Sequence, residues 1–245
     1  AAALTGAVFI VATYHWWWAA LVFGVAAIGA IFSWLWTGTA LIPEKPEKYV
    51  GLDTTLPLYR SGSASVGWWA MFITMIADLT AFVSIVFGYF FYWTVHQDFP
   101  PPDIPGPGMR WPLTGAALIL TSWLLVLVAG NRNRHDRASS FYVSLLLAAG
   151  AASAGLAALL AAPYSHGMDP TTHVYPAIVW LLVSWSALHV FCGILMQLYC
   201  AARRLAGCMT ANHDIDIRNV TLYWHFLLIT VFITVAVIAF FPELS

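Results

Sequence analysis

Residues 66–93 of this chain read VGWWAMFITMIADLTAFVSIVFGYFFYW, an apolar run that contains a single charged residue, Asp78. A helix of about 20 such residues crosses a hydrocarbon core of about 30 Å. Comparable runs follow or precede it at Trp16–Trp36, Pro112–Gly130, Ser139–Ala162, Val174–Ala202 and Val220–Phe241. With 61% hydrophobic and 9% charged residues, the composition indicates a membrane domain, because soluble domains carry about 25% charged residues.

The predicted fold class is all-α, a polytopic membrane helix bundle of about seven transmembrane helices. Helices are expected because lipid offers no hydrogen-bond partner to an unpaired backbone amide. The first apolar run, Ala1–Thr13, is too short to span and is interpreted as the end of a truncated first helix. The predicted division is residues 1–36 for the first two helices, 37–65 for a cytoplasmic linker and 66–245 for a five-helix bundle.

The basic residues predict an orientation. Nine of the ten Lys and Arg residues fall on one side of the alternating loops, and Arg110 alone falls on the other. The nine are Lys45, Lys48, Arg60, Arg132, Arg134, Arg137, Arg203, Arg204 and Arg218. By the positive-inside rule their side is cytoplasmic, so the N-terminus is predicted inside and the C-terminus outside.

Asp78 is the most informative polar residue, because a carboxylate near the bilayer centre costs about 2.5–3.5 kcal/mol on insertion scales. No Lys or Arg lies within a helical turn of it. We therefore expect a carboxyl that is protonated, hydrogen-bonded to another helix, or reached by lipid headgroups or water. Two roles stay open: a neutral acid that ties two helices together, and an acid that handles protons or faces a lipid cleft.

His189 and His225 are the other ionisable side chains expected within or near the membrane. Each could ligate haem b or a metal, but such sites in helix bundles need facing pairs with supporting hydrogen bonds. Two histidines on different helices favour interhelical hydrogen bonding. In a loop on the outer side, His166, Asp169 and His173 could gather around a cation, although an exposed polar loop is the simpler interpretation.

The three cysteines, Cys192, Cys200 and Cys208, lack CxxC spacing, so neither structural disulfides nor a zinc site is expected. The net charge of −1 gives no case for nucleic-acid binding.

The last two apolar runs and the loop between them carry a distinctive set of residues. In order, they are Ala187-Leu188-His189-Val190, Gly193, Arg203, Thr210, Asn212-His213 and Tyr223-Trp224-His225-Phe226. Their order and spacing resemble the last two helices of subunit III of haem-copper (aa3-type) cytochrome c oxidases. Residues 71–92, with Asp78 and Gly88-Tyr89-Phe90, are similar to the third helix of that family, and Pro100-Pro101-Pro102 is similar to its Pro-rich outer loop.

The resemblance implies a core subunit in a bacterial inner membrane that carries no haem or copper itself. Such subunits pack on oxidase subunit I, which with subunit II holds the haem and copper, and they support proton uptake and lasting activity during oxygen reduction. They hold phospholipids in a cleft between the first two helices and the other five. The opening 36 residues and the linker are similar to bacterial versions in which subunit III is fused behind subunit I.

The resemblance also implies site residues. Asp78 falls at the position of a cleft-facing Glu, and Arg203 falls at that of an Arg that meets a lipid phosphate. The full set of lipid- or proton-related residues is Asp78, Arg203, His189, His213, Trp224 and His225. Asp in place of Glu and Leu227-Leu228 in place of the usual Val-Asp depart from the family, so lipid holding is better supported than a shared proton role.

Three alternative functions stay open. One is the subunit-III-like partner of a quinol oxidase or a nitric oxide reductase. Another is a membrane anchor that holds haem b between His189 and His225. The last is a proton-coupled transporter that uses Asp78, although the sequence has no inverted repeat of the kind that marks many transporters.

Overall fold

The computed structural model of the chain describes residues 2–37, 47–57 and 65–243. These residues belong to two compact units, Ala1–Leu58 and Tyr59–Ser245. The predicted linker lies mostly outside the described residues, and so do Lys45 and Arg60, two of the residues on which the orientation depends.

The first unit contains a helical hairpin. α1 (Ala2–Thr13) packs against α2 (Trp17–Thr37), and the turn between them passes through His15, whose φ is 59°. α1 is the 12-residue apolar helix expected from the first run, too short to cross a bilayer. α2 matches the predicted span Trp16–Trp36 to within one residue at each end.

The first unit also contains a small β-hairpin that was not predicted. β1 (Glu47–Gly51) and β2 (Thr54–Pro57) pair antiparallel. Leu52 and Asp53 join them with φ values of 51° and 50°, as in a type I′ turn. Neither strand sequence, EKYVG or TTLP, alternates apolar and polar residues as a half-buried strand does, so the polar stretch was interpreted as a linker.

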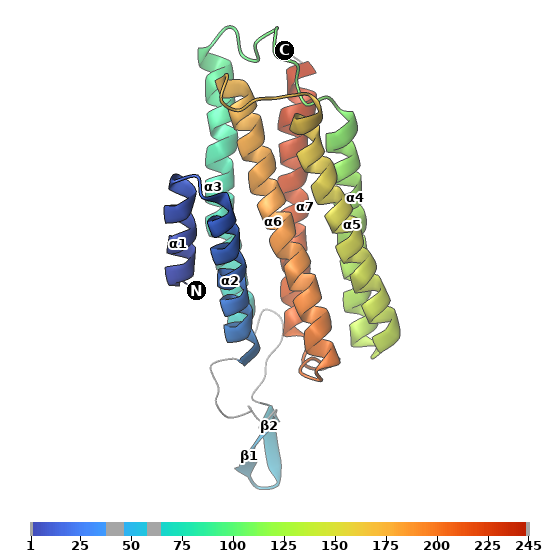
Figure 1. The fold of residues 1–245 in the computed structure, drawn as a ribbon. Helices are drawn as coiled ribbons and strands as arrows, with labels where there is room; N and C mark the ends of the chain where they lie inside the picture. Colours follow the sequence, from blue (N-terminus) through green and yellow to red (C-terminus); the bar gives the residue numbers. More distant parts are fainter. Residues whose placement is uncertain (1, 38–46, 58–64, 244–245) are drawn as a thin grey trace. The chain divides into compact units, whose positions relative to one another are not determined.

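The second unit is a bundle of five long helices (Figure 1). They are α3 (Val66–Val95), α4 (Arg110–Arg134), α5 (Ala138–Ser165), α6 (Val174–Leu205) and α7 (Ile215–Val235), the last continued by the π-helical η2 (Ala236–Phe240) and the 3-10 turn η3 (Phe241–Glu243). Ser65 caps the start of α3, because its Oγ accepts a hydrogen bond from the Trp68 amide at 3.1 Å.

The helices extend beyond the predicted apolar spans at their polar ends. α4, for example, continues from the predicted end at Gly130 to Arg134, and α7 begins at Ile215 instead of Val220. Hydropathy falls where charged residues begin, whereas helical hydrogen bonding continues through them into the interfacial region.

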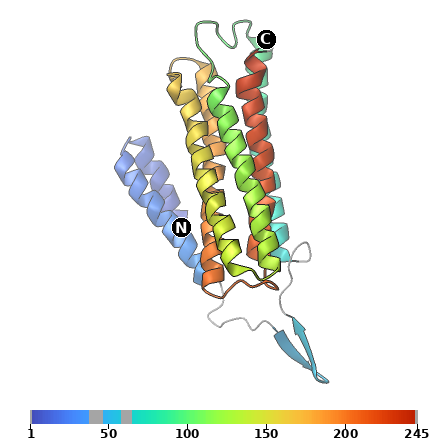
Figure 2. The same cartoon turned by 90° about the vertical axis from the view of Figure 1, so that its right-hand side faces the viewer.

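Four helices of the bundle are neighbours in a closed order: α4 contacts α5, α5 contacts α6, α6 contacts α7, and α7 contacts α4. α3 lies against α6 and α7 (Figure 1), and Figure 2 shows α4 and α5 side by side along their length. The α4–α5 turn and the α6–α7 loop share one end of the bundle. The six arginines from 132 to 218 therefore gather near that end, and Arg110 lies at the other; which end faces the cytoplasm stays a prediction.

Small residues let α4 and α5 approach closely. A Cβ atom at Gly115 would lie 2.9 Å from the Leu159 side chain and 3.3 Å from the Gly155 carbonyl oxygen. A Cβ atom at Gly155 would lie 3.0 Å from the Ile119 side chain. Close backbone approach through small residues is a typical mode of helix packing in membranes, where van der Waals contact replaces the hydrophobic effect between helices.

The exterior of the bundle is apolar. Ile73 and Phe87 on α3 and Leu188 on α6 are 62%, 67% and 59% exposed. Within the described residues, six helices, α2 to α7 with its π-helical extension, are long and apolar enough to cross a membrane. Exposed apolar side chains along helices of this length are stable in lipid, so the class is an all-α, multi-pass membrane helix bundle. This confirms the predicted fold class.

Candidate functional site

The unpaired acid of the sequence has a partner on another helix. Nε2 of His189 on α6 lies 3.6 Å from Oδ2 of Asp78 on α3. Asp78 lies about 18 Å along α3 from its start, and His189 lies about 24 Å from the end of α6, at 1.5 Å per residue. Both side chains are therefore deeper than the interfacial zone. His189, for which we expected an interhelical role, contacts a side chain of another helix.

Aromatic rings fix the imidazole of His189. Its ring stacks on that of Trp185 with centroids 3.8 Å apart, and its Nδ1 lies 2.8 Å from the Trp185 carbonyl oxygen. On the next helix, the Tyr223 hydroxyl donates a hydrogen bond of 3.1 Å to the His189 carbonyl oxygen, and Phe226 contacts the imidazole edge. The Asp78–His189 pair is thus held by residues of α3, α6 and α7.

This pair can hold one proton in two ways. The proton can sit on the carboxyl beside a neutral imidazole, or on the imidazole as an ion pair with a carboxylate. The side chain of Asp78 is 39% exposed, whereas that of His189 is 13% exposed. The carboxyl is therefore the more accessible member of the pair, and the imidazole is the member that neighbouring side chains orient.

The Tyr223-Trp224-His225-Phe226 stretch divides between core and surface. Trp224 is fully buried and packs against Gly193 of α6, where a Cβ atom would lie 3.2 Å from the Trp224 ring. His225 points elsewhere: it is exposed, its Nδ1 lies 2.6 Å from the Thr221 carbonyl oxygen, and its ring contacts Trp123 of α4. His189 and His225 therefore face different neighbours.

The two adjacent arginines at the end of α6 have different surroundings. The Nε of Arg203 donates a hydrogen bond of 3.1 Å to Asp216 at the start of α7, and its guanidinium lies over the Tyr199 ring. Arg203 is thus one partner of a partly exposed ion pair in this structure, near the end of the bundle where we predicted a lipid phosphate contact.

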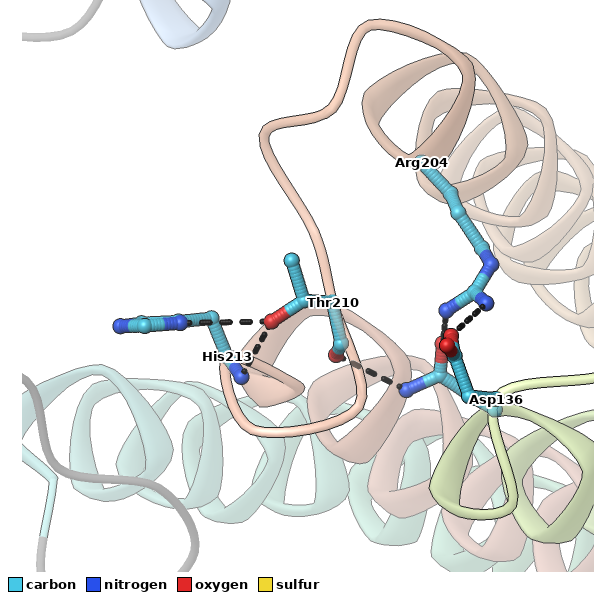
Figure 3. Close-up of polar contacts among 5 residues, drawn as sticks. Asp136, Arg204, Thr210 and His213 are labelled. Carbon is cyan, nitrogen blue, oxygen red and sulfur yellow. Dashed lines mark hydrogen bonds and ion pairs between the residues drawn. The ribbon is translucent and has the colours of Figure 1, made fainter. Parts of the chain in front are cut away.

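Arg204 is buried and organises a polar network that the sequence reasoning missed (Figure 3). Its guanidinium donates one hydrogen bond to Oδ1 of Asn133, which is fully buried, and another of 2.8 Å to Asp136. Asn133 in turn donates to the Thr210 carbonyl oxygen at 3.2 Å. The network joins the ends of α4 and α6 to the α6–α7 loop. Arg204 shares a face of α6 with Gln197 and Cys200 by helical spacing, but only the structure shows that this face is buried.

His213 belongs to the same loop. Its amide donates a hydrogen bond of 3.1 Å to the Thr210 hydroxyl, and its Nδ1 lies 3.3 Å from that oxygen (Figure 3). The Thr210 amide bonds back to the His213 carbonyl oxygen at 3.2 Å. Both residues therefore close a tight turn beside the Arg204 network.

The outer-loop residues make local contacts. His166 contacts the Ala162 carbonyl oxygen through Nδ1 at 3.0 Å, and Nδ1 of His173 accepts the Tyr175 amide at the start of α6. Asp169 accepts two hydrogen bonds from Thr171, from the amide at 2.8 Å and the hydroxyl at 2.7 Å, and these bonds lower the pKa of its carboxyl. Within the described part of the chain, no three His, Cys, Asp or Glu side chains gather as a metal site would require, and the three cysteines are free.

Comparison with known proteins adds no family assignment: no family model matches the sequence, and no curated protein matches it. The resemblance to oxidase subunit III thus depends on the residues quoted from the sequence, and it stays a prediction.

Proposed function

We propose that this chain is a non-catalytic core subunit of a respiratory haem-copper terminal oxidase, of the cytochrome c oxidase subunit III type. In this role it packs on subunit I, as a separate chain or as part of one fused polypeptide, near subunit II. It holds phospholipids and supports proton uptake and enzyme lifetime, while haem and copper belong to its partners. A subunit-III-like partner of a quinol oxidase or nitric oxide reductase is the nearest variant of this proposal.

One observation carries the proposal. Three of the residues on which the resemblance depends come from three separate apolar runs and meet in one cluster: Asp78, His189 and Tyr223 are linked by contacts of 3.6 Å and 3.1 Å. Beside them, Gly193 and Trp224 interlock α6 with α7. Residues that share a resemblance in sequence and also one neighbourhood in space support a common role better than either property alone.

The proposal is tested by native mass spectrometry of the complex isolated through this chain in mild detergent. A large haem-bearing partner is expected, with phospholipid but no haem on this chain after dissociation. The masses also distinguish a fused from a separate subunit I. A chain that carries its own haem would contradict the proposal, and so would a chain isolated without any partner.

Within this proposal, Asp78 supports long-term turnover and has no part in the oxygen chemistry. Replacing Asp78 with Ala is expected to leave the optical spectrum of the oxidase unchanged, because no haem ligand is altered. Lipid content or the number of turnovers before inactivation should fall. Asp78→Glu, which keeps the acid, is the matched control. Immediate and complete loss of turnover in a normally assembled complex would show that the reasoning is wrong.

The Asp78–His189 pair also favours a second candidate, a proton-coupled membrane transporter. Acid and imidazole pairs inside membranes are typical of proton relays. A haem b anchor is less well supported, because both ring nitrogens of His189 face protein oxygens at 2.8 and 3.6 Å. Proton flux into liposomes that contain the purified chain, abolished by Asp78→Asn, would favour the transporter.

A further inference from the structure

A groove with a charged end and apolar walls lies on the bundle, away from the contact between Asp78 and His189. It has a volume of about 360 Å³ and is formed by the end of α4, the start of α7 and the start of α3. Its lining includes Arg134, Arg218, Asp214, Trp68, Leu127 and Leu222. The volume is within the range of about 300–1,000 Å³ that is typical of small-molecule sites.

The charges in this groove leave a net positive end. Two arginines and one aspartate give a formal charge of +1. Asp214 is nearly buried and accepts a hydrogen bond of 2.7 Å from Nε of Arg218. The two terminal nitrogens of Arg218 make no hydrogen bond to described residues. Arg134 is exposed and makes no ion pair with any described residue. Arg134 and the terminal nitrogens of Arg218 therefore have donors without a partner among the described residues, and such guanidinium donors bind phosphate oxygens well.

The polarity of the groove changes with depth. From Asp214 to His225, the groove follows α7 for about 16 Å at 1.5 Å per residue. The charged residues lie at the end of the bundle where the arginines gather, and Trp68 lies near the same end, two residues after the start of α3. Leu127 and Leu222 lie further inward along α4 and α7. Tryptophan is typical of the membrane–water interface, where its ring lies at headgroup level.

We propose that this groove binds one phospholipid with an anionic headgroup, its phosphate against Arg134 and Arg218, the Trp68 ring at headgroup level and an acyl chain along Leu127 and Leu222. The charged end supplies the phosphate contact, and the net positive charge favours a headgroup with an overall negative charge over a zwitterionic one. The inference requires only a membrane helix bundle, so it is independent of the oxidase proposal.

The test is a lipid titration of the chain in mild detergent, followed by native mass spectrometry. The probes are phosphatidylglycerol, phosphatidylcholine and inorganic phosphate. Wild-type chain is expected to bind one phosphatidylglycerol more tightly than phosphatidylcholine. Arg134→Gln should weaken that first binding step about tenfold, the effect of losing one charge-assisted hydrogen bond. Arg134→Lys should retain most of it.

Arg132→Gln is the matched control, because it removes the same charge from the same helix end without lining the groove. Its effect should be less than about twofold. Equal weakening by both Gln variants would overturn the proposal, and so would unchanged binding in Arg134→Gln. Displacement of the lipid by millimolar inorganic phosphate would identify free phosphate as the ligand instead.

A photo-reactive residue at Leu127 gives a second measurement in the intact membrane. Cross-linking to lipid is expected. Cross-linking to another protein would assign the groove to a protein interface and overturn the lipid proposal. Neither measurement depends on whether a haem-bearing partner is present, so failure here is separate from failure of the proposed function.

Discussion

Replacing Arg204 with Gln should destabilise the helix bundle by about 2–4 kcal/mol. Most of this comes from the hydrogen bond to Asn133, because a bond to a charged group contributes about 1.5–3 kcal/mol and Asn133 is fully buried. The guanidinium also lies 5.3 Å from the centre of the Phe141 ring, a contact of about 0.5–1 kcal/mol. Asp136 adds less than about 1 kcal/mol, because its side chain is 78% exposed.

The assay is unfolding of the purified chain by SDS in mixed micelles, followed by far-ultraviolet circular dichroism. Arg203→Gln is the matched control, since it removes the same charge from the neighbouring position. Its ion pair with Asp216 is partly exposed, so we expect a loss of about 1 kcal/mol or less. If Arg203→Gln destabilises the chain as much as Arg204→Gln, the argument from burial is refuted. A double variant with Asn133→Ala should lose less than the sum of the two single losses, because the residues share one bond.

Three further predictions follow from other parts of the bundle. In a double-mutant cycle, Asp78→Asn and His189→Gln should show a coupling energy of about 0.5–2 kcal/mol in the same unfolding assay, and additive losses would contradict the pairing. Gly115→Ala should cost about 1–3 kcal/mol because its Cβ atom would overlap α5, whereas Gly150→Ala, with open space around it, should be neutral or stabilising. The pKa of Asp169, measured by nuclear magnetic resonance, should lie below the usual carboxyl value of 3.8. Its loop contacts should therefore persist above pH 3.8 and be lost as the pH falls through the lowered pKa. A midpoint at or above 3.8 would contradict the two hydrogen bonds.

The sequence predicted the spanning helices well, because a stretch of about 20 apolar residues without a charge has few alternatives in a membrane. It was less informative at helix ends, where α4 and α7 continue through polar residues. It also missed the β-hairpin at 47–57, whose strand sequences do not alternate apolar and polar residues.

For the candidate site, the sequence singled out Asp78 and His189 separately, because an ionisable residue at membrane depth is costly whatever its partner. Only the packing of α3 on α6 shows that the two meet. Arg203 was selected because it falls at the position of an arginine in the resembled family. Arg204 ends the same apolar run, and hydropathy does not distinguish the two. They differ by a rotation of about 100° on the helix, which turns Arg204 into the bundle.

The sequence by itself therefore determined that this protein folds in a membrane, and it determined the number and position of its long apolar helices. It also identified the ionisable residues that are costly in lipid without a partner. Tertiary structure alone decided which partners they have: His189 for Asp78 and Asn133 for Arg204. It also decided that Arg134 and Arg218 line one groove. The physical reason is that hydropathy is a property of each segment, whereas a hydrogen bond between helices depends on rotation and crossing of two segments far apart in the chain.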